Sequence, residues 1–168
     1  MRHFFIFLIL FTALSAEENF IVSDGSNIIF EMGSSLDMRS TPACSFNIAI
    51  SLIGFETGVL IDELRPIRDY QEGYDSSLEV WKKMHCPLTW MKNSVVWYSR
   101  LTTAEIGLER MQQYLNDFEY GNKDFSGGIT KAWISSSLKI SPREQLRFIE
   151  KMLAFQLPVS QRSVNFTT

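Results

Sequence analysis

Residues 46–55 form a segment that is apolar nearly all the way round, and this segment limits most strongly how the chain can fold. A helix without a polar side is unsuited to the surface and is normally enclosed by other elements. We therefore predict a buried central helix that ends near Gly58, since glycine commonly terminates helices. Its apolar members are Phe46, Ile48, Ala49, Ile50, Leu52, Ile53 and Phe55.

Two β-prone runs, at residues 20–22 and 28–30, flank a polar loop that contains Gly25. This arrangement predicts a β-hairpin near the N-terminus. Residues 65–89 are polar and irregular, with Tyr, Trp and Pro scattered among them. We expect no regular element in that stretch.

Two later segments carry signals for the start of a helix. Thr102 and Glu105 have the spacing of a capping box, and Ser141 and Glu144 repeat that spacing around Pro142. We expect an amphipathic helix after each box. The apolar residues of the first helix are Ile106, Met111, Tyr114, Leu115 and Phe118, and those of the second are Leu146, Ile149, Met152 and Leu153. The predicted fold class is therefore α+β and mostly helical, with one antiparallel hairpin.

Residues 1–16 have the features of a cleavable secretory signal. Arg2 provides the positive start, residues 4–11 are an apolar run, and small residues precede Glu17. The run is shorter than the ~20 residues that a membrane-spanning helix needs. We expect cleavage near Ser15 or Ala16 and export to the periplasm. The mature chain, residues 17–168, is then expected to keep no membrane anchor.

Composition excludes several kinds of function. The chain has 168 residues, a net charge of −3 and an isoelectric point near 5.4, so no nucleic-acid partner is expected. After the signal the only histidine is His85, and the only cysteines are Cys44 and Cys86. This set is too small for a zinc site, and we expect no metal or cofactor. The two thiols can pair after export, but two buried, unpaired thiols are the favoured interpretation.

Three short motifs occur in order along the chain. They are T-P-A-C-S-F-N-I at residues 41–48, S-V-V at residues 94–96 and Y-G-N at residues 120–122. Together they resemble the motifs S-P-A-S-T-F-K-I, S-x-V and Y-G-N of the class D, or oxacillinase-type, serine β-lactamases. Flanking sequence at residues 54–60 and 137–142 agrees as well, so the resemblance covers the whole mature chain.

The resemblance implies a fold, an activity and a set of roles. The family has an antiparallel sheet flanked by helices, and it hydrolyses penicillin-type β-lactams. Its serine forms an acyl-enzyme, and a carboxylated lysine one helical turn later is the base for acylation and deacylation. The S-x-V serine relays protons, and a tryptophan holds the lysine. The matching catalytic positions are Cys44, Asn47, Ser94 and Trp133, and the matching substrate-binding positions are Val96, Tyr120 and Asn122.

Two of these positions depart from the family pattern. Cys44 replaces the nucleophilic serine, and Asn47 replaces the lysine. An amide cannot be carboxylated and is not a base near neutral pH. General-base catalysis typically contributes ~10²–10⁴ in rate. We therefore expect hydrolysis to be absent or very weak, and β-lactam antibiotics to be the ligands if anything binds.

Other interpretations remain open. The chain can be a non-hydrolytic penicillin-binding or sensor module that is acylated at Cys44. A thiol hydrolase built from Cys44 and His85 is a third possibility. Ser136 and Lys139 also satisfy S-x-x-K, although they lie beyond Y-G-N. Ser94, Tyr120 and Trp133 have simpler interpretations as a helix cap, a turn residue and a core aromatic.

The K-T-G motif that the family places on a later strand does not occur in this sequence. By the family standard, residues 17–168 are therefore expected to be a partial domain without its C-terminal strands. A lone hairpin is marginally stable, and its free edge favours non-native pairing. We expect poor folding or aggregation.

Overall fold

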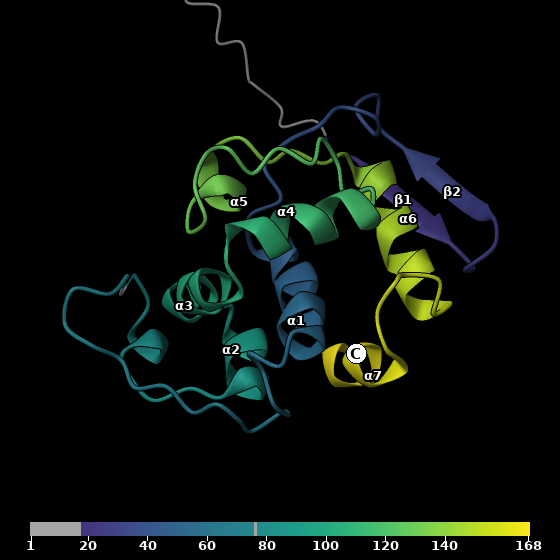
Figure 1. The fold of residues 1–168 in the computed structure, drawn as a ribbon. Helices are drawn as coiled ribbons and strands as arrows, with labels where there is room; N and C mark the ends of the chain where they lie inside the picture. Colours follow the sequence, from purple (N-terminus) through teal and green to yellow (C-terminus); the bar gives the residue numbers. More distant parts are fainter. Residues whose placement is uncertain (1–17, 76) are drawn as a thin grey trace, which may run out of the picture.

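The computed structural model describes residues 18–75 and 77–168. The predicted signal, residues 1–16, lies outside the described residues. Seven α-helices and one two-stranded antiparallel sheet make up the regular structure of the described part. The fold is α+β and mostly helical, as predicted, with the hairpin at the edge of a helical body (Figure 1).

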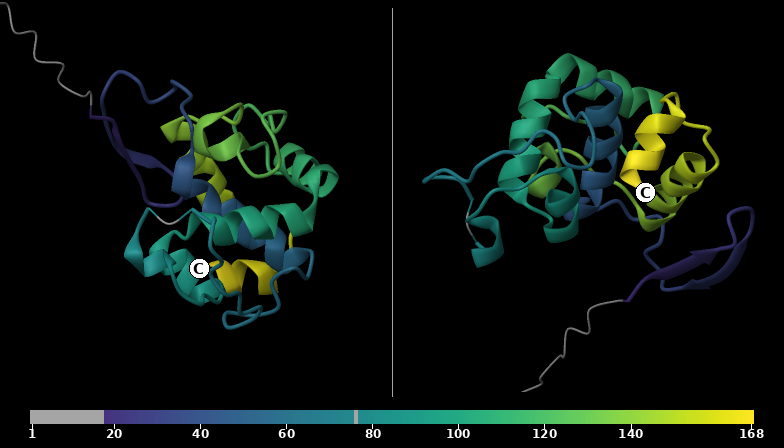
Figure 2. Two further views of the ribbon diagram at one scale, coloured as in Figure 1. Left: turned by 90° about the vertical axis from the view of Figure 1, so that its left-hand side faces the viewer. Right: turned by 90° about the horizontal axis from the view of Figure 1, so that it is seen from below.

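The apolar segment forms the central helix that its composition predicts. A short 3-10 helix, η1 (Ala43–Phe46), leads directly into α1 (Asn47–Glu56). Nearly every α1 side chain is buried, because α3 (Val96–Ile106) and α7 (Gln161–Thr167) pack against it. Figure 2 shows α7 lying beside α1. The helix ends next to Gly58, whose φ of +75° breaks the helical path.

The N-terminal hairpin is confirmed. Strands β1 (Phe20–Ser23) and β2 (Ile28–Met32) pair antiparallel, with Phe20 opposite Met32 and Val22 opposite Phe30. The Phe20 and Phe30 rings meet edge to face at 6.0 Å between centroids. The sheet contains only these two strands in the described residues, and β1 packs against α6 (Pro142–Leu153). All of β2 is exposed.

The second predicted helix start is confirmed. The Ser141 hydroxyl accepts a hydrogen bond from the Glu144 N–H, and the Glu144 carboxylate accepts one from the Ser141 N–H. Pro142 occupies the first turn of α6, where its missing N–H removes no helical hydrogen bond.

The first predicted helix start is wrong. Thr102 and Glu105 lie inside α3, and the Thr102 hydroxyl donates to the Tyr98 carbonyl of the preceding turn. The amphipathic helix is α4 (Leu108–Asp117), which begins after Gly107. Gly107 has a φ of +88° and separates α3 from α4, whereas the apolar pattern predicted one continuous helix from Ile106 onwards. The capping spacing occurred by chance within one helix.

Residues 65–89 are irregular, as expected, apart from the 3-10 helix η2 (Glu79–Trp81) and the start of α2 (Pro87–Asn93). The remaining helix is the short α5 (Ala132–Ser135). In residues 18–75 and 77–168, every helix is too short or too polar to cross a bilayer.

The Glu56 carboxylate at the end of α1 forms hydrogen bonds with the start of α7. Glu56 Oε2 accepts hydrogen bonds from the Ser160 N–H at 2.8 Å and from the Ser160 and Ser163 hydroxyls at 2.7 Å each. Burial tends to raise the pKa of this carboxyl, but the hydrogen bonds from Ser163 and Ser160 outweigh it and lower the pKa from the usual 4.5. The ionised form of Glu56 is therefore favoured by folding.

The substitution Glu56→Gln is expected to lower the free energy of unfolding at pH 7 by about 1–2 kcal/mol, since it weakens hydrogen bonds to a charged acceptor. Because the pKa of Glu56 is lower in the folded state than in the unfolded state, its ionised carboxylate stabilises the fold at pH values above the unfolded pKa. This stabilisation is lost as the pH falls through the folded pKa. Denaturant unfolding at pH 7 and near pH 3 measures both effects. The parent should lose more stability than the variant on acidification. Substitution of the exposed Glu109 by Gln is the control. The prediction is contradicted if the Glu56→Gln variant loses as much stability between pH 7 and pH 3 as the parent does.

Candidate active site

The first motif turns sharply just before α1. Ala43 has a φ of +48°, in the left-handed region that L-residues rarely adopt, and Cys44 follows on η1 with its side chain exposed. Phe46 then points into the core and is fully buried. The turn therefore presents the residue at the nucleophile position to solvent. Local backbone strain of this kind is often found at functional sites.

Both cysteines are free thiols, as favoured from the sequence, but the prediction that they are buried is wrong. Cys44 is exposed and Cys86 is half-buried. Cys44 lies on the outer side of η1, and Cys86 occupies the N-cap of α2. The left-handed turn at Ala43 leaves the Cys44 side chain facing solvent.

Asn47, which the motif resemblance aligns with the lysine, lies in the core. Its side-chain carbonyl accepts a hydrogen bond of 2.8 Å from the Ser99 hydroxyl, which in turn accepts one of 2.8 Å from the Trp90 indole N–H. Asn47 is 5% exposed, and Ser99 and Trp90 are almost fully enclosed. This buried relay, Trp90–Ser99–Asn47, links α2, α3 and α1. All three groups are neutral, so the relay contains no base.

An aromatic cluster covers the other side of the first motif. Phe46 contacts Tyr120, Trp133 and Phe125, with ring centroids 5.3, 5.7 and 5.9 Å away. Trp133 is also stacked on Phe125 at 6.0 Å. The fold thus brings two predicted site residues, Tyr120 and Trp133, against the residue that precedes Asn47. In this arrangement both rings act as core aromatics.

The Tyr120 hydroxyl is directed at α6 and donates a hydrogen bond of 2.8 Å to Gln145 Oε1. Burial raises the pKa of this phenol well above its ordinary value, so Tyr120 remains neutral at physiological pH.

Ser94 and Val96 lie at the junction of α2 and α3. Ser94 is the C-cap of α2 with a φ of +50°, and Val96 is the first residue of α3. Both side chains are half-buried. Within the described part of the chain, the Ser94 hydroxyl makes no hydrogen bond. The structure places it five residues before Ser99 of the relay, with no partner for proton transfer.

Asn122 holds two loops together. Its amide donates to the Ser137 carbonyl at 2.8 Å and accepts from the Lys139 N–H at 2.9 Å. A Cβ at the neighbouring Gly121 would lie 2.0 Å from the Lys139 carbonyl, so only glycine fits there. The Y-G-N motif therefore has a clear structural function as a loop clamp.

The alternative dyads find other partners. The two ring nitrogens of His85 lie 3.2 Å from the Thr89 hydroxyl and 3.0 Å from the Val80 carbonyl, and burial lowers the pKa of the ring. His85 is therefore not placed to activate Cys44. The Lys139 ammonium donates to the Thr41 hydroxyl at 2.7 Å, not to Ser136. Residues 18–75 and 77–168 contain no group of three His, Cys, Asp or Glu that could bind a metal ion.

Sequence reasoning missed Ser99 and Trp90. Neither belongs to one of the three motifs, and a lone serine in a stretch of mixed polar and apolar residues gives no sign that it is buried. Only the packing of α3 against α1 brings Ser99 to Asn47.

Comparison with known proteins places this arrangement in one family. The penicillin binding protein transpeptidase domain matches residues 16–160. The chain therefore belongs to this family. It spans about half the length of the curated relatives it matches.

The similar proteins within that family are class D β-lactamases, which confirms the resemblance of the motifs. The chain is 41% identical to β-lactamase OXA-1 of Escherichia coli over 135 residues, which are 77% of the chain and 48% of the relative. It is 35% identical to β-lactamase OXA-9 of Klebsiella pneumoniae over 151 residues, which are 84% of the chain and 54% of the relative. The OXA-427 class D β-lactamase structure superposes with a TM-score of 0.83 at 38% identity, over 88% of this chain and 63% of that one.

Proposed function

We propose that this chain is a class D β-lactamase relative that binds β-lactams without hydrolysing them at enzymatic rates. The environment of Asn47 carries the proposal. At the position where the resemblance implies a carboxylated lysine, the chain has a buried amide whose hydrogen-bond partner is the Ser99 hydroxyl. The relay offers no group that can take a proton from the nucleophile or from water.

The proposal includes export through residues 1–16 and a periplasmic location for the remaining chain. It also assigns Cys44 to the nucleophile position and Ser94, Val96, Tyr120, Asn122 and Trp133 to the surrounding site. Their support is the order and spacing of the motifs together with the packing of Tyr120 and Trp133 around Phe46.

Steady-state hydrolysis of nitrocefin and oxacillin tests the proposal. The purified chain is expected to give a rate no higher than a buffer blank, because both half-reactions lack a base. A variant with Cys44→Ser and Asn47→Lys is measured beside it. Turnover by the unmodified chain at ordinary enzyme rates, about 1–10³ s⁻¹, contradicts the proposal.

A second candidate function is a penicillin-binding module acylated at Cys44, which the exposure of this free thiol favours. The Cys44 thiolate would attack the lactam carbonyl, the ring C–N bond would break, the ring nitrogen would take up a proton, and a thioester would form. Without a base to activate water, that thioester would persist.

Mass spectrometry of the intact chain after incubation with a penicillin tests this function. The expected result is a stable mass increase of one penicillin, located at Cys44 by peptide mapping. A Cys44→Ala variant should show no adduct, whereas a Cys86→Ala variant should acylate like the parent. An unmodified parent after prolonged incubation rejects the acylation function and leaves the first proposal intact.

A further inference from the structure

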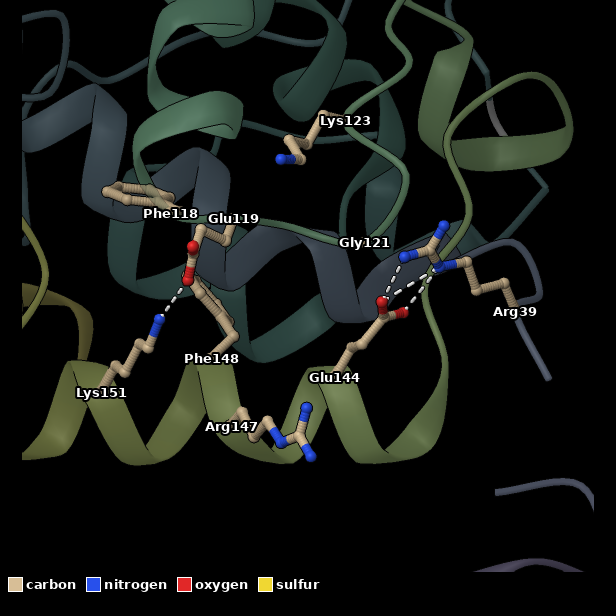
Figure 3. Close-up of a pocket in the computed structure, with 9 residues that line it drawn as sticks. All are labelled: Arg39, Phe118, Glu119, Gly121, Lys123, Glu144, Arg147, Phe148 and Lys151. Carbon is tan, nitrogen blue, oxygen red and sulfur yellow. Dashed lines mark hydrogen bonds and ion pairs between the residues drawn. The ribbon is translucent and has the colours of Figure 1, made fainter. Parts of the chain in front are cut away.

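A charged pocket lies between α6 and the turn that follows α4, and Gly121 of the Y-G-N motif is among its lining residues. It has a volume of about 270 Å³. Its floor is apolar, formed by Phe118 and Phe148, whose rings pack at 5.7 Å in the core. Its rim is charged, with side chains from α6, from the turn and from the loop before η1 (Figure 3). The charged residues are Arg39, Glu119, Lys123, Glu144, Arg147 and Lys151.

The two carboxylates of the rim are already paired. Glu144 accepts hydrogen bonds from Arg39 Nε at 3.0 and 2.9 Å, and Glu119 accepts one of 2.6 Å from Lys151 (Figure 3). The Arg39 guanidinium lowers the pKa of Glu144 to about 2, and Lys151 lowers the pKa of Glu119. Both carboxylates therefore stay ionised and neutralise one cation each.

Two cations form no direct ion pair with a described residue, although Lys123 lies close enough to Glu119 to help lower the pKa of that carboxyl. In the part of the chain that the structure describes, neither Lys123 Nζ nor the Arg147 guanidinium makes a hydrogen bond or an ion pair. Figure 3 shows Lys123 on the turn and Arg147 on α6, well apart from one another, with the Arg147 side chain lying along the helix. Four cationic and two anionic side chains leave two positive charges in excess. This local excess is notable in a chain whose net charge is −3.

We propose that this pocket binds a small multivalent anion carrying carboxylate or phosphate groups. The excess positive charge of the rim, from Lys123, Arg147, Arg39 and Lys151, would attract the anion. A guanidinium is well suited to a planar carboxylate or a phosphate, and an ammonium supplies a compact second charge. A monovalent anion would neutralise only one of the two excess charges.

Titration of the full chain with citrate, followed by calorimetry at low ionic strength, tests the proposal. We expect saturable binding that weakens as salt approaches 0.15 M, where the Debye length is about 8 Å. The double variant Lys123→Gln/Arg147→Gln should lower the association constant at least about tenfold, because two charge-assisted contacts are removed. Inorganic phosphate should bind through the same residues, and acetate should bind much more weakly.

The double variant Arg110→Gln/Lys131→Gln is the matched control, since it removes two exposed cations outside the pocket. It should bind citrate like the parent. Amide chemical shifts of the parent give an independent readout, with citrate expected to move those of residues 119–123 and 147–151. The proposal is overturned if citrate binding is not saturable, if the control loses as much affinity as the pocket variant, or if the shifts move elsewhere.

Discussion

The substitution Asn47→Lys is expected to destabilise the fold by about 3–5 kcal/mol near pH 6, the typical cost of an unpaired buried charge. Asn47 is 5% exposed. Its side chain is hydrogen-bonded to the neutral Ser99, which is in turn hydrogen-bonded to the neutral Trp90. A lysine side chain there would place an ammonium group in the core without a carboxylate beside it. The prediction therefore tests directly whether the relay can accept the family's charged residue.

The pH dependence of this effect has a defined sign. Burial lowers the pKa of an ammonium group below its unfolded value of about 10.4, so the penalty is complete below the folded pKa. It shrinks by about 1.4 kcal/mol per pH unit between the folded and unfolded values. Denaturant unfolding of parent and variant from pH 6 to pH 10 should show the two curves converging.

An Asn47→Met variant is the control, because it has similar length and no charge. It should show a pH-independent difference from the parent. The prediction is contradicted if the Asn47→Lys variant is as stable as the parent at pH 6. In that case a counter-charge or a water molecule other than the relay residues must stabilise the ammonium group in the core around Ser99. Incubation of the variant with ¹³C-labelled bicarbonate then reports, by NMR, whether the introduced amine is carboxylated.

Self-association through the hairpin is the second large effect that we expect. Phe20, Ile28, Phe30 and Met32 share one face of the sheet and are between 45% and 54% exposed. Exposed contiguous apolar surface of this kind commonly leads to association or aggregation. Each strand of the two-stranded sheet also leaves one edge without a neighbour in the described residues, which adds unpaired backbone groups.

The double variant Ile28→Lys/Phe30→Lys is expected to remain monomeric at concentrations where the parent forms larger species. Light scattering after size-exclusion chromatography, repeated over a dilution series, measures the difference. A Leu78→Lys/Met84→Lys variant is the control, because these residues are equally exposed but lie in the 65–89 segment. A parent chain that stays monomeric and unfolds in one sharp transition would disprove both this prediction and the expected poor folding.

The sequence alone determined the elements with strong local signals. The all-round apolar residues 46–55 required a buried helix, because no other placement removes every side of such a helix from water. Ser141, Pro142 and Glu144 fixed the start of α6, since their hydrogen bonds lie within one turn. The three motifs also identified the family, because their order and spacing are properties of the sequence.

Tertiary structure decided what depends on distant residues. Thr102 and Glu105 have the spacing of a cap, but Gly107 and the packing of α3 on α1 placed them inside a helix. The exposure of Cys44 was not predictable either, since it depends on the left-handed turn at Ala43. The partners of Asn47 come from helices more than forty residues further along the chain, with Ser99 52 positions away. The sequence therefore singled out Asn47 through its motif, and only the packed core showed that its hydrogen-bond partners are neutral and buried.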